Sequence, residues 1–81
     1  MRTETIRTEV QRLIRQAPFR KFALNLENGD RIIIEHPENI AFDPASNGSP
    51  GSGDFYVISA SLRFFGTFEA ISSVAVTDPG D

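Results

Sequence analysis

The sequence predicts an α+β fold, in which an N-terminal amphipathic helix packs on a small, strongly bent antiparallel sheet of five to six strands, a partly open barrel. Three observations predict this fold. Apolar residues first recur with the period of a helix, then alternate with the period of a strand, and finally gather in short runs between turn residues. The 81 residues have room for one domain, which we place at 1–81.

The predicted helix covers about residues 3–17 and carries a single apolar stripe. Pro18 disfavours helical geometry at the residue before it and therefore sets the end of the helix. A single stripe buries one side of a helix, so we expect this helix to pack on the sheet. The stripe consists of Ile6, Val10, Leu13, Ile14 and Ala17.

Two strands are predicted next, at about residues 21–27 and 30–36. Alternating apolar residues at 22, 24 and 26 are typical of a half-buried strand. Asn28-Gly29 can supply the two positive-φ residues of a type I′ turn, which predicts a tight hairpin. Pro37 cannot donate a ladder hydrogen bond, and we expect it to stop the second strand.

The later strands are predicted to be short, at about residues 39–43, 54–59, 64–70 and 73–77. The segment 43–54 is rich in glycine, proline and serine, which predicts a flexible loop outside the core. Gly66 interrupts one of these strands, as a glycine at a bulge or bend does.

The composition limits the chemistry of the chain. It contains no cysteine and a single histidine, His36, so neither a thiolate site nor a histidine paired with a second one is available. We expect a non-enzymatic protein without catalytic residues, metal, cofactor or an evident small-molecule substrate. No apolar run approaches the length of about 20 residues that a membrane helix needs, and the N-terminus lacks the apolar stretch of a signal peptide. A cytoplasmic location without a membrane partner is the expectation.

Charge is distributed unevenly along the chain. The net charge is −3, yet six of the eight basic residues lie at or before Lys21. This basic end could attract RNA or another anion. The alternative is an ordinary solvated helix surface, which the acidic overall balance favours. The five candidate contacts to an anion are Arg7, Arg12, Arg15, Arg20 and Lys21.

Aromatic residues form a second candidate site, an interface made of Leu62, Phe64, Phe65 and Phe68. Adjacent residues of a strand point to opposite faces, so we expect one of Phe64 and Phe65 to leave the core. Exposed aromatic rings would provide a platform for stacked bases or a contact with another chain. The alternative is that all of them fill the core of a small domain.

Three motifs of the chain resemble a family of small, mostly uncharacterised bacterial proteins. The family pattern reads roughly Ala-Gln-Pro-Phe-Arg-Pro-Phe, then Leu-x-x-Gly-Arg, then His-Pro-Asp. The resemblance covers residues 6 to 42 and implies a single domain, without implying an activity. The matching segments are Gln16-Ala17-Pro18-Phe19-Arg20-Lys21-Phe22, Leu26-Glu27-Asn28-Gly29-Asp30-Arg31 and His36-Pro37-Glu38.

A second resemblance is to the Sm-like fold, which includes the bacterial Sm-like RNA chaperone. It rests on the helix-first order, on Leu26-Glu27-Asn28-Gly29, and on residues 70–74, Ala-Ile-Ser-Ser-Val, which look like the closing Ala-Ile-Ser-Thr-Ile of the chaperone. The resemblance implies an Sm-like or SH3-like barrel and a homo-oligomer, in which the fourth and fifth strands pair between subunits into a ring. Phe68 and Glu69 replace the basic pair with which the chaperone contacts RNA.

These observations predict a small binding module that associates with itself, with Sm-like RNA binding as one candidate activity. The alternative is a protein–protein adaptor without nucleic acid, which would use an exposed edge strand and the cluster around Phe64 and Phe65.

Overall fold

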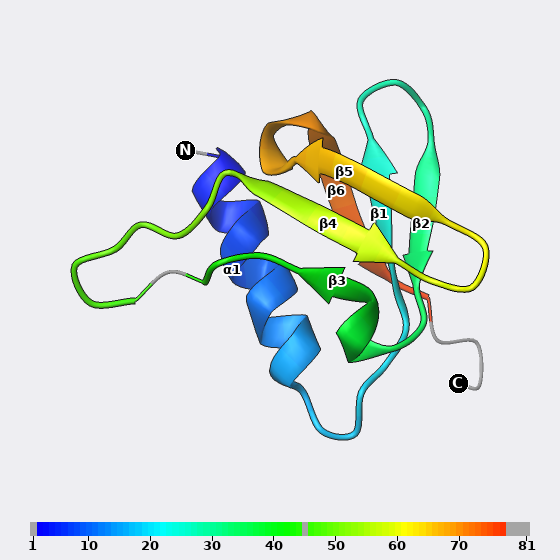
Figure 1. Ribbon diagram of the computed structural model, residues 1–81, viewed down its shortest axis with the longest axis horizontal. Helices are drawn as coiled ribbons and strands as arrows, with labels where there is room; N and C mark the ends of the chain where they lie inside the picture. The colour runs from blue at the N-terminus through cyan, green and yellow to red at the C-terminus, as the bar shows by residue number, and fades with distance from the viewer. Residues whose placement is uncertain (1, 45, 78–81) are drawn as a thin grey trace.

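The computed structural model describes residues 2–44 and 46–77 and has the predicted α+β class (Figure 1). One helix is followed by two small antiparallel sheets of three strands each, with strand orders β2-β1-β6 and β3-β4-β5. The helix α1 covers Arg2–Arg15, and the strands are β1 (Phe22–Leu26), β2 (Arg31–Ile34), β3 (Ile40–Ala41), β4 (Asp54–Ile58), β5 (Arg63–Thr67) and β6 (Ile71–Val76). Two short 3-10 helices, η1 (Pro37–Asn39) and η2 (Phe68–Ala70), connect the sheets.

The strands form two sheets that do not close, where the sequence predicts one bent sheet. The chain leaves the first sheet after Ile34, because Pro37 begins η1 and cannot continue the ladder. The Asn39 side chain donates a 2.9 Å hydrogen bond to the carbonyl of Ile58 and so fixes η1 to the end of β4. The second change of sheet occurs at η2, within the stretch 64–70 that the sequence predicts as a strand.

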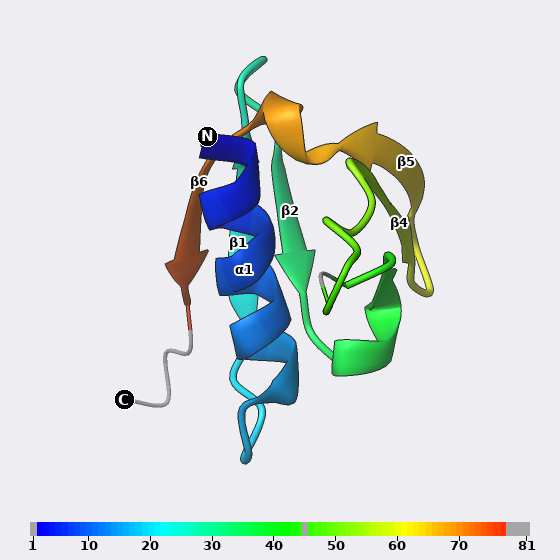
Figure 2. The ribbon, with the colours of Figure 1, turned by 90° about the vertical axis from the view of Figure 1, so that its left-hand side faces the viewer.

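The helix and both sheets share one core. Figure 2 shows α1 lying across β1, with β6 on one side and β2, β4 and β5 on the other. Val10 and Leu13 of the predicted stripe are fully buried, Ile6 and Ile14 flank them, and Ala17 lies beyond the end of the helix and is exposed. The core consists of Val10, Leu13, Phe22, Leu24, Leu26, Ile32, Ile34, Ile40, Phe55, Val57, Phe68 and Ile71. No helix in the described part of the chain is long and apolar enough to cross a membrane.

The β1–β2 hairpin turns through three residues rather than two. The Gly29 amide donates to the carbonyl of Leu26, and the Leu26 amide donates to the carbonyl of Asp30, which is a type I turn followed by a glycine bulge. Gly29 has a φ of 97°, whereas Asn28 has no positive φ, so the predicted type I′ turn is wrong. The Asn28 side chain instead accepts a 2.9 Å hydrogen bond from the Asp30 amide, which holds the turn in this form.

The segment between β3 and β4, predicted as the loop 43–54, extends away from the sheets beside α1 (Figure 1). Asp43 and Ser52 join its two ends, since the Ser52 amide donates to the Asp43 carbonyl and the Asp43 amide donates to the Ser52 hydroxyl. Nearer the tip, Ser46 and Ser49 pair through two backbone hydrogen bonds of 3.0 and 2.9 Å. Residue 45 lies outside the described part. The segment is thus closed by its own hydrogen bonds.

Candidate functional site

The first candidate site is the set of basic residues in the N-terminal part of the chain. Arg7, one of its five members, is buried in the interior. Its side chain is only 5% exposed, and its Nη1 donates a 3.0 Å hydrogen bond to the carbonyl of Ser52. The buried Nε has no hydrogen-bond partner. Arg7 therefore connects α1 to the segment between β3 and β4 and is not available to an external phosphate.

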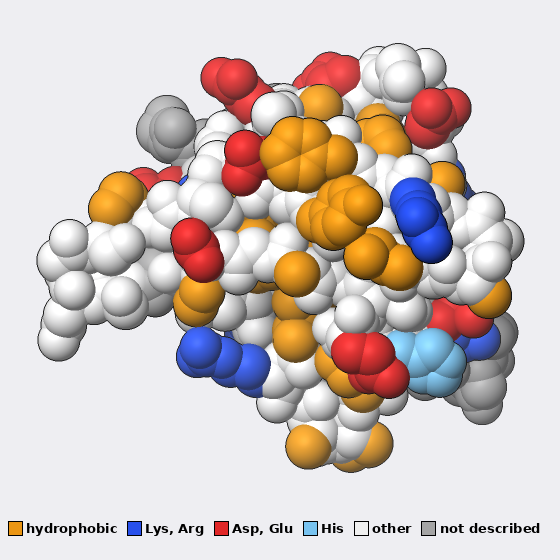
Figure 3. Space-filling view, in the orientation of Figure 1, with side chains coloured by type: hydrophobic (Ala, Val, Ile, Leu, Met, Phe, Trp, Pro, Cys, Tyr) orange, Lys and Arg blue, Asp and Glu red, His pale blue; other side chains and the backbone are white. Residues whose placement is uncertain are grey.

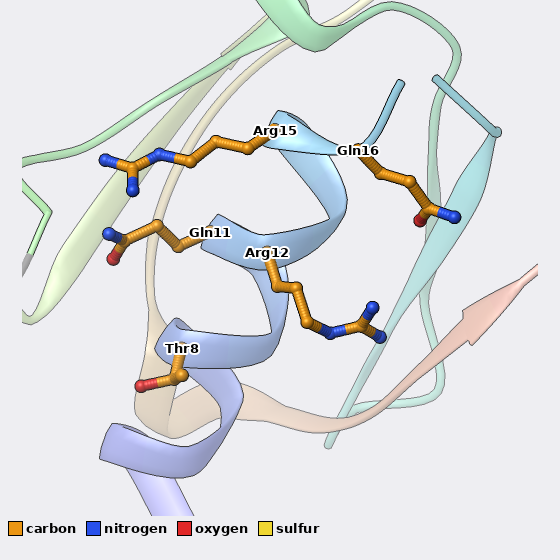
Figure 4. A pocket seen from close by; sticks show the side chains of 5 residues that line it. All are labelled: Thr8, Gln11, Arg12, Arg15 and Gln16. Atoms are coloured by element: carbon orange, nitrogen blue, oxygen red, sulfur yellow. The ribbon is translucent and has the colours of Figure 1, made fainter. Parts of the chain in front are cut away.

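Arg12 and Arg15, the next two candidate residues, do not line an enclosed binding pocket either. Arg12 forms an ion pair with Glu9, and this hydrogen-bonded carboxylate raises the pKa of Arg12. The depression around Arg12 and Arg15 is lined by α1 and the residue after it alone, and Figure 4 shows Gln11 and Arg15 pointing to one side of the helix and Arg12 and Gln16 to the other. A single helix surface without an opposite wall does not enclose a ligand.

Arg20 and Lys21 complete the predicted set, and they follow the end of α1. Arg20 is half-buried, whereas Lys21 is exposed and its carbonyl accepts a hydrogen bond from the Thr77 amide. Of the five candidates, Arg15 and Lys21 are exposed and form no ion pair within residues 2–44 and 46–77. Two separated cations supply little of the phosphate neutralisation on which nucleic-acid affinity depends.

The second candidate site divides between the core and the surface. Phe68, predicted at the interface, is completely buried, where its ring meets those of Phe42 and Phe55 at centroid distances of 5.0 and 5.1 Å. Phe64 is half-buried and packs on the core. Phe65 has 66% of its surface exposed, and Leu62 is also exposed. Phe64 and Phe65 therefore lie on opposite faces of β5, as the sequence predicts.

Two exposed residues on β4, Tyr56 and Ile58, extend the surface around Phe65. Tyr56 is the cross-strand neighbour of Phe65, and the two rings meet edge-on at 6.0 Å. Tyr56 and Ile58 are 41% and 47% exposed. We call Tyr56, Ile58 and Phe65 the aromatic face, and Figure 3 shows hydrophobic side chains gathered over β4 and β5. The signal that could have identified it is the unbroken run Phe55-Tyr56-Val57-Ile58, because a strand sends alternate residues to opposite faces and so exposes two of these four.

The aromatic face carries one charge of each sign at its ends. Arg63 is the register partner of Ile58, and Asp54 is the partner of Thr67 at the other end of the β4–β5 pair. Both charged residues are exposed and point to the same face as Phe65, because they are spaced by even numbers along their strands. The surface is therefore apolar at its centre and electrically neutral as a whole.

His36, the single histidine of the chain, lies directly before η1. Its backbone amide donates a 3.1 Å hydrogen bond to the Asn39 side chain, which places it at the start of η1 in a structural role. Within residues 2–44 and 46–77, no three histidine, aspartate or glutamate residues are grouped as metal ligands.

Comparison of the chain with protein-family models, with curated proteins and with solved structures gives no match.

The contact between Arg7 and Ser52 leads to a testable expectation for the segment it holds. Replacing Arg7 with methionine fills the buried position with an unbranched apolar side chain and removes the hydrogen bond to the Ser52 carbonyl. A hydrogen bond from a charged donor contributes about 1.5–3 kcal/mol, so exchange of the Ser52 amide with solvent should accelerate about tenfold or more. Amide exchange measured by NMR tests this, with Arg15→Met as the exposed control. Unchanged exchange at Ser52 would show that Arg7 does not hold the segment.

Proposed function

We propose that this protein is a non-enzymatic binding module that associates with itself and docks another protein chain on the aromatic face. The observation that carries the proposal is the exposure of Phe65, Tyr56 and Ile58 side by side on two paired strands. Large exposed aromatic side chains in a contiguous patch are typical of protein contact surfaces, because they bury much apolar area at a small entropic cost.

The charges around the aromatic face favour a protein over a nucleic acid. Stacking of bases on aromatic rings is normally combined with a positively charged groove that follows the phosphates. Here Arg63 is balanced by Asp54, while Arg7 is buried and Arg12 is paired with Glu9. A partner protein segment with apolar side chains at its centre can pack on the aromatic face and does not require a positively charged groove.

The order of the elements supports an Sm-like or SH3-like arrangement as part of the same proposal. The β1–β2 hairpin follows the helix, a 3-10 turn precedes the last strand, and β6 returns to pair with β1. Folds of this kind leave strand edges unpaired, and such edges are satisfied by association with another chain. Self-association is the simplest way to cover them.

Photocrosslinking tests the docking proposal at the face itself. We expect a photoreactive benzoylphenylalanine in place of Ile58 to form an adduct with one protein in the native host. Adding Phe65→Ser should reduce this adduct at least about fivefold, because an exposed anchor contributes to binding but little to folding. The same photoreactive residue in place of Asn47, at the exposed tip of the segment between β3 and β4, is the control and should not form that adduct.

Each other outcome counts against the docking proposal. A crosslink to RNA, together with a high ratio of absorbance at 260 to 280 nm, would favour the nucleic-acid alternative. An adduct that does not depend on Phe65, or that forms equally at Asn47, would overturn docking on the aromatic face.

A further inference from the structure

Among residues 2–44 and 46–77, no strand pairs with the outer edge of β2. In the order β2-β1-β6, β2 pairs only with β1. The Leu26 amide bonds to the Asp30 carbonyl, and hydrogen bonding alternates along an antiparallel pair, so Ile32 and Ile34 direct their backbone groups towards β1. The intervening Arg31 and Ile33, and Glu35 directly after the strand, then direct their N–H and C=O groups outwards.

The side chains at this edge carry opposite charges around an apolar centre. Arg31, Ile33 and Glu35 are all exposed, and Ile33 keeps 40% of its surface in contact with solvent. Their spacing of two places the three side chains on one face. Reading along the edge gives a cation, an isoleucine and an anion at equal intervals.

The rest of the chain leaves space along this edge. A cavity of about 290 Å³ lies between β2 and the turn of residues 59–62, and another of about 210 Å³ lies between Ile32 and Phe64. Both cavities border Arg31 and Leu62. The turn of residues 59–62 therefore faces β2 across open volume, and no residue of that turn pairs with β2 in the sheet.

We infer that β2 pairs antiparallel with β2 of a second copy of this chain, about a two-fold axis at Ile33. This pairing places Ile33 opposite its own counterpart, and Arg31 opposite the partner's Glu35 in both directions. Opposite charges across a strand pair attract, and an interface that repeats itself through a two-fold axis forms a closed dimer. The inference rests on the self-association in the proposed function and names its interface.

The other free edges do not specify a second copy in this way. β3 has two residues, β5 carries Arg63 as its one charge, and β6 carries no charged residue. A shift of register between two β2 strands would move Arg31 away from the partner's Glu35. The charged ends of β2 therefore fix both the orientation and the register of the pair. The two subunits then share one six-stranded sheet, β6-β1-β2 continued by its symmetry copy.

Charge exchange tests the inference directly. Arg31→Glu places two like charges opposite each other, and this occurs twice across the axis, so the dimer dissociation constant should rise about tenfold or more. Glu35→Arg should have a similar effect. The double variant Arg31→Glu/Glu35→Arg restores opposite charges and should recover dimerisation to within about threefold of the original chain. Sedimentation equilibrium gives the masses, and circular dichroism confirms that the variants fold.

A cysteine at the axis supplies a second measurement. The chain has no cysteine, so Ile33→Cys introduces a single thiol. Hydrogen-bonded cross-strand partners have Cα atoms about 5.5 Å apart, which is within the range of about 4.4–6.8 Å that disulfides accept. Mild oxidation should convert most of the protein to a covalent species of twice the 9.0 kDa chain mass. Asn47→Cys is the control and should remain largely unlinked.

The outcomes separate this inference from the proposed function. A dimer or larger ring that ignores both charge reversals and forms no disulfide at residue 33 would overturn the β2 interface while leaving self-association in place. A monomer at all concentrations would overturn both the interface and self-association. Docking on the aromatic face is decided independently by the crosslink that depends on Phe65.

Discussion

Replacing Phe68 with alanine should lower the free energy of unfolding by about 3–5 kcal/mol. The ring is completely buried at the start of η2 and contacts the rings of Phe42 and Phe55. Its removal forfeits the burial of a large apolar side chain and leaves a cavity in the place where α1 and η2 meet. A domain of this size has a total stability of about 4–12 kcal/mol, so a large fraction of that stability would be lost.

Urea unfolding followed by circular dichroism measures this effect, and Phe65→Ala is the matched control. Phe65 is three residues away and mostly exposed, and its truncation should change stability by about 0.5 kcal/mol or less. Equal effects of the two substitutions would mean that Phe68 is not the residue that fills the core.

Replacing Gly66 with alanine should lower the stability by about 1–3 kcal/mol. A Cβ atom at this position would lie 2.5 Å from Cε2 and 2.9 Å from Cζ of Phe64. Phe64 packs on the core and against Phe55, at a ring distance of 5.9 Å, so it cannot move aside without disturbing other contacts. The result is an overfilled site in which either the ring or the strand has to shift.

Gly53→Ala is the control for this substitution, because nothing lies within 4 Å of a Cβ atom there. We expect the free energy of unfolding of the Gly53→Ala variant to be unchanged or raised by up to about 1 kcal/mol, since alanine reduces the entropy of the unfolded chain. Thermal unfolding of the two variants provides the comparison. If Gly66→Ala proved as stable as the original chain, Phe64 would not be held in its observed position.

Periodicity predicted the elements better than it predicted the connections between them. The helix was expected at about residues 3–17 and covers Arg2–Arg15, since the apolar stripe and Pro18 both act locally. The sequence predicts Gly66 at a bulge or bend, and the structure has no bulge there, since Gly66 lies in regular register with Phe55. Its role depends on Phe64 two residues away folding back over it, which is a tertiary contact that a strand pattern does not contain.

The candidate site could be predicted only in part for the same reason. Alternation along β5 predicted that one of Phe64 and Phe65 is exposed, but the contribution of Tyr56 and Ile58 depends on the pairing of β4 with β5. Arg7 was expected at the surface because it is charged. Its burial follows from a hydrogen bond to Ser52, 45 residues later in the chain, which no local pattern encodes.

The hydrogen bonds between Asp43 and Ser52 also have a practical consequence. They bring the chain back to nearly the same point, so the number of residues enclosed matters little to the rest of the protein. The entropy of closing such an excursion grows only slowly with its length. An epitope or a fluorescent reporter spliced between Asn47 and Gly48 would consequently be carried at a distance from the hydrophobic interior, with the strands on either side left undisturbed.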